Sequence, residues 1–168
     1  DNGKLLRGVW VRTQKGLQYY YGPFYYKQGW KDIEGERYFF KEYYAMTGVS
    51  PVRPAHSVYD TWYEFDDNGK LIGEAKDGLY WYNDNLYYVV DTLSQHTGLY
   101  LIDGNYYYFL SNYTAVHSQN RWIGNTGSAI PAGTYRFDEN GKMLMDTAIV
   151  EENGELYYYF QGRRVANA

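Results

Sequence analysis

The sequence predicts an all-β protein, an elongated and solenoid-like array of stacked β-hairpin repeats. Three observations support this: one twelve-residue pattern recurs along the chain, aromatic side chains make up 21% of the 168 residues, and no segment shows sustained helical periodicity. Repeats that contact mainly their neighbours bury a continuous spine instead of one globular core. Tyrosine suits so thin a fold, because its ring buries apolar surface while its hydroxyl stays near water.

The recurring pattern is clearest in Gly98 to Phe109, which predicts one β-hairpin. Leu99 to Ile102 are expected to form a strand, Asp103-Gly104 a two-residue turn that accepts positive φ, and Tyr106 to Phe109 the returning strand. Side chains alternate between the faces of a strand, so both faces of this hairpin carry aromatic rings. Such a hairpin therefore needs neighbours on both sides.

Copies of this hairpin occur before and after it. They lie at Gly29 to Phe40, Gly78 to Val89 and Ala148 to Tyr159, with a weaker copy at Gly16 to Tyr21. A second motif interleaves with them. It is found at Tyr63 to Leu71 and again at Tyr135 to Met143, each time around an Asn-Gly pair that favours a tight turn.

These spacings predict a single repeat array over residues 1–168. Within it we expect long modules at 29–77 and 98–147 and short hairpin units at 1–28, 78–97 and 148–168. The segments 48–60 and 116–132 depart from the repeat and are expected to be loops, while 91–96 is expected to allow one turn of helix. Asp1 to Leu6 match Asp67 to Ile72, so the chain is expected to begin inside a repeat, as a piece of a longer protein.

Charge and composition exclude several partner classes. The net charge of −4, with a pI near 5.3 and no basic cluster, argues against nucleic acid, whose phosphates require a basic face. Cysteine is absent, which excludes disulfides and thiolate metal sites. No apolar run reaches the roughly 18 to 20 residues of a membrane span. We therefore expect neither nucleic-acid binding nor membrane insertion.

A catalytic or metal site is not indicated. His56, His96 and His117 are far apart in sequence, and no nucleophile motif accompanies them. Acidic residues concentrate at hairpin tips, where they serve turn geometry. The runs Asp66 to Gly69 and Asp138 to Gly141 favour turn chemistry over a calcium site, although calcium stays an alternative. We expect no catalytic residues, no metal, no cofactor and no enzymatic activity.

The aromatic residues are the remaining candidates for function. A flat ring beside hydroxyls, amides or carboxylates can stack on the apolar face of a sugar, although packing between repeats is the competing role for each ring. The predicted ligand-binding residues are Trp30, Tyr38, Trp62, Trp81, Tyr106, Asn120, Arg121 and Trp122.

Trp122 leads this set, because loops on a rigid scaffold often carry binding residues. We expect its ring to line a ligand groove, with Arg121 and Asn120 beside it as hydrogen-bond donors. The alternative is that Trp122 fills the gap that the irregular segment opens between hairpins.

Gly29 to Phe40, continuing to Gly48, resembles one unit of the cell-wall-binding repeats, and Phe137 to Met143 resembles the turn that closes such units. This superfamily includes the choline-binding modules of Gram-positive surface proteins, the glucan-binding repeats of glucansucrases and the repetitive regions of clostridial toxins. The resemblance implies a non-catalytic module that binds carbohydrate or a cell-wall polymer. It also implies an extracellular location, at the bacterial cell surface or as a secreted protein.

The resemblance implies that a choline cage would consist of three rings. They are a Trp after the leading Gly, an aromatic residue that opens the returning strand, and a third ring from the next repeat. Trp30 matches the first position, but Arg37 holds the second and would place a positive charge where the cation binds. The sequence therefore favours neutral glycan over choline or teichoic acid. A structural spacer or adhesin stalk that contacts protein is a further alternative, and pairing into a homodimer stays open.

Overall fold

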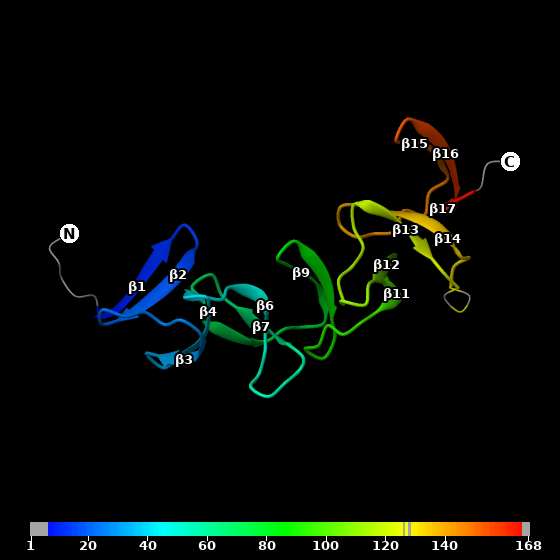
Figure 1. The fold of residues 1–168 in the computed structure, drawn as a ribbon. Coiled ribbons are helices and arrows are strands. Elements are labelled where there is room, and N and C mark those ends of the chain that lie inside the picture. Colours follow the sequence, from blue (N-terminus) through cyan, green and yellow to red (C-terminus); the bar gives the residue numbers. More distant parts are fainter. Residues whose placement is uncertain (1–6, 126, 128, 166–168) are drawn as a thin grey trace. The chain divides into compact units, whose positions relative to one another are not determined.

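The computed structural model describes residues 7–125, 127 and 129–165, and this part of the chain consists of β-strands and turns, without helix (Figure 1). The helical turn expected at 91–96 is wrong, because Val90 and Leu93 pair in a β-bridge there. The strands are β1 (Arg7–Thr13), β2 (Gly16–Tyr21), β3 (Gly29–Ile33), β4 (Glu36–Lys41), β5 (Tyr44–Ala45), β6 (Gly48–Val52), β7 (Thr61–Phe65), β8 (Leu71–Glu74), β9 (Gly78–Tyr82), β10 (Asn85–Val89), β11 (Gly98–Ile102), β12 (Asn105–Phe109), β13 (Gln119–Ile123), β14 (Gly133–Phe137), β15 (Ala148–Glu152), β16 (Glu155–Phe160) and β17 (Arg163–Arg164).

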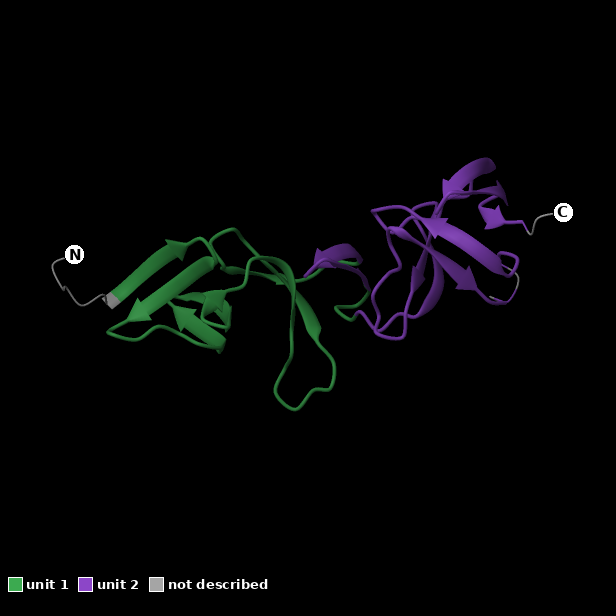
Figure 2. Ribbon diagram, turned by 45° about the horizontal axis from the view of Figure 1, so that its top comes forward, with its two compact units in different colours: residues 1–77, 89–93 green, residues 78–88, 94–168 purple. Residues whose placement is uncertain are grey.

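The described chain divides into two compact units (Figure 2). Unit 1 comprises residues 7–77 and 89–93, and unit 2 comprises 78–88 and 94–165. Each contains a five-stranded sheet of the same topology, with the order β1-β2-β5-β4-β3 in unit 1 and β13-β14-β17-β16-β15 in unit 2. The expected single array with its module boundaries stays a prediction, and the repeat match at residues 1–6 lies outside the described residues.

The predicted hairpins are present. β3 pairs with β4, β11 with β12 and β15 with β16, each antiparallel and in the register that the sequence copies imply, and β9 pairs with β10. In the central copy Gly98 faces Phe109, and the turn residues Asp103 and Gly104 have φ values of 48° and 78°. Positive φ at both central positions is the type I′ geometry whose twist matches that of the flanking strands.

Two segments expected as loops contribute strands instead. β6 lies within 48–60 and pairs with β7, and β13 lies within 116–132 and pairs with β14. Both are edge strands of their sheets. An edge strand tolerates polar residues and proline, because one row of its backbone groups needs no partner. Because of Pro51 in β6 and the polar residues at the start of β13, both segments were predicted to be loops instead of strands.

The Asn-Gly turns are held by carboxylates. Asp66 Oδ1 accepts hydrogen bonds from the backbone N–H groups of Asn68 and Lys70 at 2.8 and 2.9 Å, and Asp138 does the same in its own turn. These oxygens thus perform the turn chemistry that the sequence favoured. Among the described residues, no group of three His, Asp or Glu side chains is placed to hold a metal ion. No described helix is long and apolar enough to cross a membrane.

Each hairpin has two faces, which we name from β11–β12. Its front face carries Leu99, Leu101, Tyr106, Tyr108 and Leu110, and its back face carries Tyr100, Ile102, Tyr107 and Phe109. The back face packs on the β9–β10 hairpin, and the front face packs on a core formed by the segment that follows. That core consists of Val116, Ile123, Ile130, Tyr135, Phe137 and Met143. Neighbours thus pack against both aromatic faces, and Tyr106 and Tyr108 on the front face stay partly exposed.

Unit 1 is built in the same way. The back of β3–β4, with Ile33, Tyr38 and Phe40, packs against Trp10 and Tyr19 of the first hairpin. Its front, with Trp30 and Phe39, packs on a cluster from β6, β7 and β8. Residues of that cluster are Val52, Tyr63, Phe65 and Leu71.

A buried tyrosine at the back of β15–β16 carries a large pKa shift. The Tyr159 side chain is 0% exposed, its hydroxyl donates to Glu152 Oε1 at 2.7 Å, and the Arg136 guanidinium lies 4.6 Å from its ring centroid. Burial, followed by the hydrogen bond to the Glu152 carboxylate, raises the pKa of Tyr159 to about 12 from its ordinary value of 10.0.

This shift predicts alkaline destabilisation. Below pH 10 both the folded and the unfolded chain keep the Tyr159 proton, whereas from about pH 10 to 12 only the unfolded chain loses it, so stability falls as pH rises through that window. The loss from this residue should reach about 2 kcal/mol. Urea unfolding between about pH 9 and 12 measures it. Tyr159→Phe should reduce the slope, because it removes this contribution.

Candidate functional site

Two of the predicted ligand-binding rings are buried. Trp62 is 1% exposed and Tyr38 is 9% exposed. The backbone N–H of Trp62 donates to the carbonyl oxygen of Thr92 at 2.9 Å, so its strand is fixed within unit 1. Neither ring can stack on a ligand in this structure, and their predicted binding roles are corrected to packing roles.

Trp30 is half-buried in an aromatic cluster, and an arginine side chain lies over its ring. Its ring meets those of Phe39 and Tyr63 edge-on, with centroid distances of 5.1 and 5.2 Å. The Arg37 guanidinium lies 5.0 Å from the Trp30 centroid, at the distance of a cation–π contact. A cation of the protein itself therefore covers one face of the Trp30 ring.

Lys and Arg side chains cover other rings in the same way. Lys31 lies 5.0 Å from the Tyr26 ring centroid and Lys27 lies 5.7 Å from that of Tyr43. In unit 2 the Arg164 guanidinium stacks on Tyr157. In each of these cation–π contacts, a Lys or Arg side chain of the same chain lies over the electron-rich face of the ring.

Trp81 and Trp122 are the exposed tryptophans of the predicted set, at 46% and 64%. Trp81 belongs to β9 and meets His117 edge-on, with 5.2 Å between the ring centroids. Trp122 is too exposed to fill a gap between hairpins, so that alternative is wrong. Both rings remain accessible to a ligand.

The trio in β13 does not form one groove. Side chains alternate along the strand, which places Arg121 on the same face as the buried Ile123, toward the core, and Trp122 with Asn120 on the opposite face. Arg121 lines a pocket with Tyr108 of β12, whereas Trp122 lines none of the three pockets described next. The structure thus places Arg121 at a pocket, whereas the Trp122 ring, predicted to lead the set, lies on the opposite face of β13.

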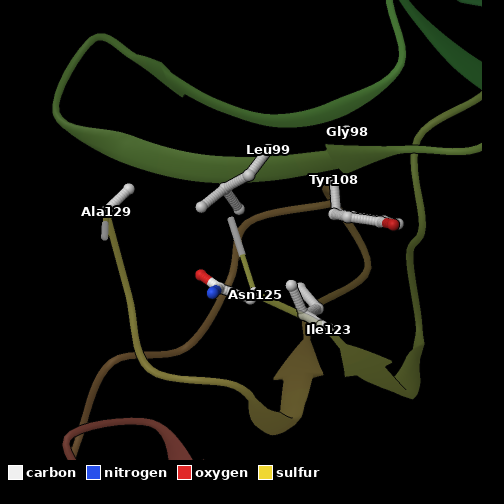
Figure 3. A pocket seen from close by; sticks show the side chains of 7 residues that line it. Gly98, Leu99, Tyr108, Ile123, Asn125 and Ala129 are labelled. Atoms are coloured by element: carbon white, nitrogen blue, oxygen red, sulfur yellow. The ribbon is translucent and has the colours of Figure 1, made fainter. Parts of the chain in front are cut away.

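Three adjoining pockets follow the front face of β11–β12 in unit 2. The largest, of about 670 Å³, is lined by Thr97, Gly98, Tyr108, Phe109, Leu110, Ser111, Asn112 and Arg121. The second, of about 340 Å³, shares Gly98 and Tyr108 with the first and adds Leu99, Ile123, Gly124, Asn125 and Ala129. Figure 3 shows the Leu99 and Tyr108 side chains on the hairpin above Ile123 and Asn125.

The third pocket, of about 300 Å³, shares Ala129 with the second. It is lined by the predicted residue Tyr106, together with Tyr135, Phe160 and Arg163 among others. Sequence reasoning missed Tyr108, because nothing within the tyrosine triplet separates an accessible ring from a packed one. The alternation that places Tyr106 and Tyr108 on one face is the signal that links them.

We call the largest pocket the Tyr108 groove. Its lining includes Tyr108, Arg121, Asn112 and Ser111. The ring offers an apolar stacking surface, and the polar groups supply directional donors and acceptors. A ligand that suits this combination has flat apolar C–H faces bordered by hydroxyl groups.

No protein-family model matches the sequence, and the comparison with curated proteins finds no significant relative. Solved structures do match. CbpJ from Streptococcus pneumoniae TIGR4 is 19% identical, over 95% of this chain and 53% of that chain, with a TM-score of 0.41. Choline binding protein F from Streptococcus pneumoniae, in the presence of a peptidoglycan analogue, is 19% identical over 96% and 53%, with a TM-score of 0.42.

A third match is alternansucrase in complex with isomaltononaose, 19% identical over 98% of this chain and 14% of that chain, with a TM-score of 0.32. The chain spans about half the length of CbpJ and of choline binding protein F. The solved structures similar to this chain thus include a choline binding protein.

Proposed function

We propose that this chain is a non-catalytic module that binds carbohydrate through the Tyr108 groove, as part of an extracellular bacterial surface or secreted protein. The observation that carries the proposal is the groove itself, in which Tyr108, Arg121 and Asn112 face one volume of about 670 Å³. A volume of this size accommodates a small ligand or a few units of a longer one.

The adjoining pockets extend the proposal from one sugar to a chain. Gly98 and Tyr108 border the first two pockets, and Ala129 borders the second and third. A polymer lying along the front of β11–β12 would meet the Tyr108 ring first and the Tyr106 ring further on. Successive subsites of this kind favour an oligosaccharide or a cell-wall glycan.

Neutral glycan is favoured over choline. Arg37 stacks on Trp30 at 5.0 Å, and a second cation would have to displace it against charge repulsion. The Tyr108 groove contains an arginine and no acidic lining residue, which is also unfavourable for a quaternary ammonium group. We therefore expect choline to bind less tightly than sugar.

A protein-contacting role as a spacer or adhesin stalk is the second candidate, and one loop favours it. Between β6 and β7, Val58 is 74% exposed and Tyr59 is 49% exposed. Arg53 Nε donates to Asp60 Oδ1 at 2.9 Å and closes the base of this loop. An exposed apolar tip on a fixed base suits contact with another protein.

Substituting the groove arginine tests the proposal. Arg121→Ala should weaken the binding of isomaltononaose or a peptidoglycan tetrasaccharide by about tenfold or more, since hydrogen bonds from a charged donor contribute roughly 1.5–3 kcal/mol. Isothermal titration calorimetry measures the affinity. Arg121 is exposed, so the melting temperature should stay the same.

Trp122→Ala is the matched control. Trp122 is the neighbour of Arg121 in β13, but its side chain lies on the opposite face of the strand and outside the groove. Binding that is lost in Trp122→Ala and retained in Arg121→Ala would move the site to the other face. Absence of sugar binding together with tight choline binding would overturn the preference for glycan. Absence of both would favour the protein-contacting role.

A further inference from the structure

Two arginine side chains of unit 2, Arg121 and Arg163, differ from the other described arginine side chains in having no partner. They form no ion pair, hydrogen bond or ring contact with another described residue. The arginines that do bind a carboxylate or a backbone carbonyl oxygen are Arg12, Arg37, Arg53, Arg136 and Arg164. The charges of Arg121 and Arg163 are therefore available to a ligand.

The sheet places these two arginines on one face and in a single row. Arg121 of β13 is opposite Tyr135 of β14, and Tyr135 is opposite Arg163 of β17. Residues directly opposite in antiparallel strands share a face, and neighbouring strands lie about 4.8 Å apart, so the two arginine backbones are about 10 Å apart. This is the face whose core, including Tyr135, packs against Tyr106 and Tyr108 of the hairpin.

Each arginine lines a pocket together with one tyrosine of that hairpin. Arg121 lines the Tyr108 groove, and Arg163 lines the third pocket with Tyr106. The second pocket joins them, since it shares Tyr108 with the groove and Ala129 with the third pocket. We call the three pockets together the pocket strip. It offers an aromatic ring and a guanidinium group at each end.

The pocket strip has no acidic residue among its described lining residues. The chain as a whole has 20 Asp and Glu residues against 16 Lys and Arg residues, so this local excess of positive charge is opposite to the overall composition. A concave surface that carries charge of one sign attracts ligands of the other sign. The pocket strip therefore suits a negatively charged ligand.

The Arg163 side chain is held in place by its packing on Gly133. A Cβ at Gly133 would lie 2.5 Å from the Arg163 Cγ, so the glycine leaves the space that this side chain fills. Tyr44 of β5 holds the equivalent place in unit 1 and lies against Gly16 in the same way. Tyr44 is partly exposed although β6, β7 and β8 follow it, so this position is accessible in both units.

We propose that the pocket strip binds an acidic glycan, with carboxylate groups on Arg121 and Arg163 and sugar rings on Tyr108 and Tyr106. This inference rests on the proposed sugar groove and names the class of sugar. A guanidinium group donates two parallel hydrogen bonds to a carboxylate, a match of geometry and charge that a neutral hydroxyl does not provide. Neutral and acidic sugars both suit the rings, but the two unpaired cations favour the acidic ones.

Binding of hexagalacturonate and of its methyl ester to the parent chain tests the proposal. The two ligands have the same sugar rings, and the ester lacks the negative charges. By isothermal titration calorimetry at about 50 mM sodium chloride, the acid should bind at least about tenfold more tightly than the ester. Raising the salt to about 500 mM should reduce this advantage, because it screens the charges of exposed groups.

The carboxylate can belong to the sugar ring, as in hexagalacturonate, or to a substituent, as in the lactyl groups of a peptide-free peptidoglycan tetrasaccharide. Comparing the tetrasaccharide with its own methyl ester separates these two sources. Tighter binding of either acid than of its ester supports the proposal, and the acid that binds more tightly identifies the source.

Equal affinity of both acids and their esters would overturn the acidic preference and leave the proposed sugar groove in place. So would binding of isomaltononaose by a chain that binds neither acid. A chain that binds none of these sugars would contradict the proposed function itself. The failure of this inference is thus distinguishable from the failure of the groove.

Arg163→Gln removes one charge and keeps an amide donor. It should weaken the binding of the preferred acid by about tenfold, while the affinity for the ester should change by less than about twofold. Lys142→Gln is the matched control, because Lys142 is exposed in unit 2 and lines none of the three pockets. Equal losses in both variants would indicate a general effect of net charge and contradict the site. Circular dichroism checks that both variants are folded.

Discussion

Replacing Trp62 with alanine is expected to lower the free energy of unfolding by about 3–5 kcal/mol, the range observed when a large buried aromatic side chain is removed. Trp62 is 1% exposed and is among the largest fully buried side chains of the described chain. Its backbone also joins β7 to Thr92 and to Ala75, through hydrogen bonds of 2.9 and 3.0 Å. A cavity at this position would therefore weaken unit 1 where several segments meet.

Chemical denaturation followed by tryptophan fluorescence or circular dichroism measures this loss. Trp122→Ala removes the same side chain from a position that is 64% exposed, and it should change stability by less than about 0.5 kcal/mol. Similar losses in both variants would show that burial does not distinguish these tryptophans. A Trp62→Ala chain of unchanged stability would contradict the packing role assigned above.

The second large effect is expected at Gly69, in the Asn-Gly turn after β7. Its φ is +80°, which is unfavourable for any residue with a Cβ, and a Cβ there would lie 2.8 Å from the Ala45 Cβ and 3.2 Å from the Met46 carbonyl oxygen. Neither neighbour can move aside by changing a rotamer. Gly69→Ala should therefore cost about 2–4 kcal/mol, from left-handed backbone strain and overpacking together.

Gly35→Ala provides the control within the same unit. Gly35 has a φ of +83°, but an added Cβ would meet nothing within 4 Å. This variant should lose only about 1 kcal/mol, the backbone contribution alone. Thermal unfolding of both variants separates the steric term from the conformational one. Equal losses would mean that the turn can move away from Ala45.

The hairpins were predictable because local chemistry determines them. Asp103-Gly104 and its counterparts accept the positive φ of a type I′ turn, and such a turn fixes the register of the strands on both sides. The interleaved Asn-Gly turns were equally recognisable, since Asp66 and its copy cap them through side-chain oxygens. The repeated sequence pattern then predicted each further hairpin without any information about the residues packed around it.

The edge strands β6 and β13 were missed for the opposite reason. Their residues lack regular alternation, and their partners are selected by tertiary packing that a local pattern does not encode. The candidate site shows the same limit. Trp62 and Trp122 are the same residue type, yet one is enclosed and the other is open, because the strands around each differ.

The sequence predicted a binding role for Arg121 because it belongs to an irregular segment on a regular scaffold, where binding residues concentrate. Tyr108 was not, since its environment depends on which hairpin face the next segment covers. Face assignment by alternation was available from the sequence, but the identity of the covering segment was not. The composition of the groove therefore required the structure.

The sheet topology has a consequence for how the chain acquires its structure. Every sheet draws its strands from one continuous stretch, 7–45 for the first five-stranded sheet, 48–74 for the three-stranded sheet and 119–164 for the last. Contacts between residues close in sequence form early and rapidly, because closing short loops costs little entropy. We therefore expect each sheet to form as soon as its own stretch of sequence is available for folding. A chain that emerges from a narrow channel can then fold one sheet after another, before its last residues emerge.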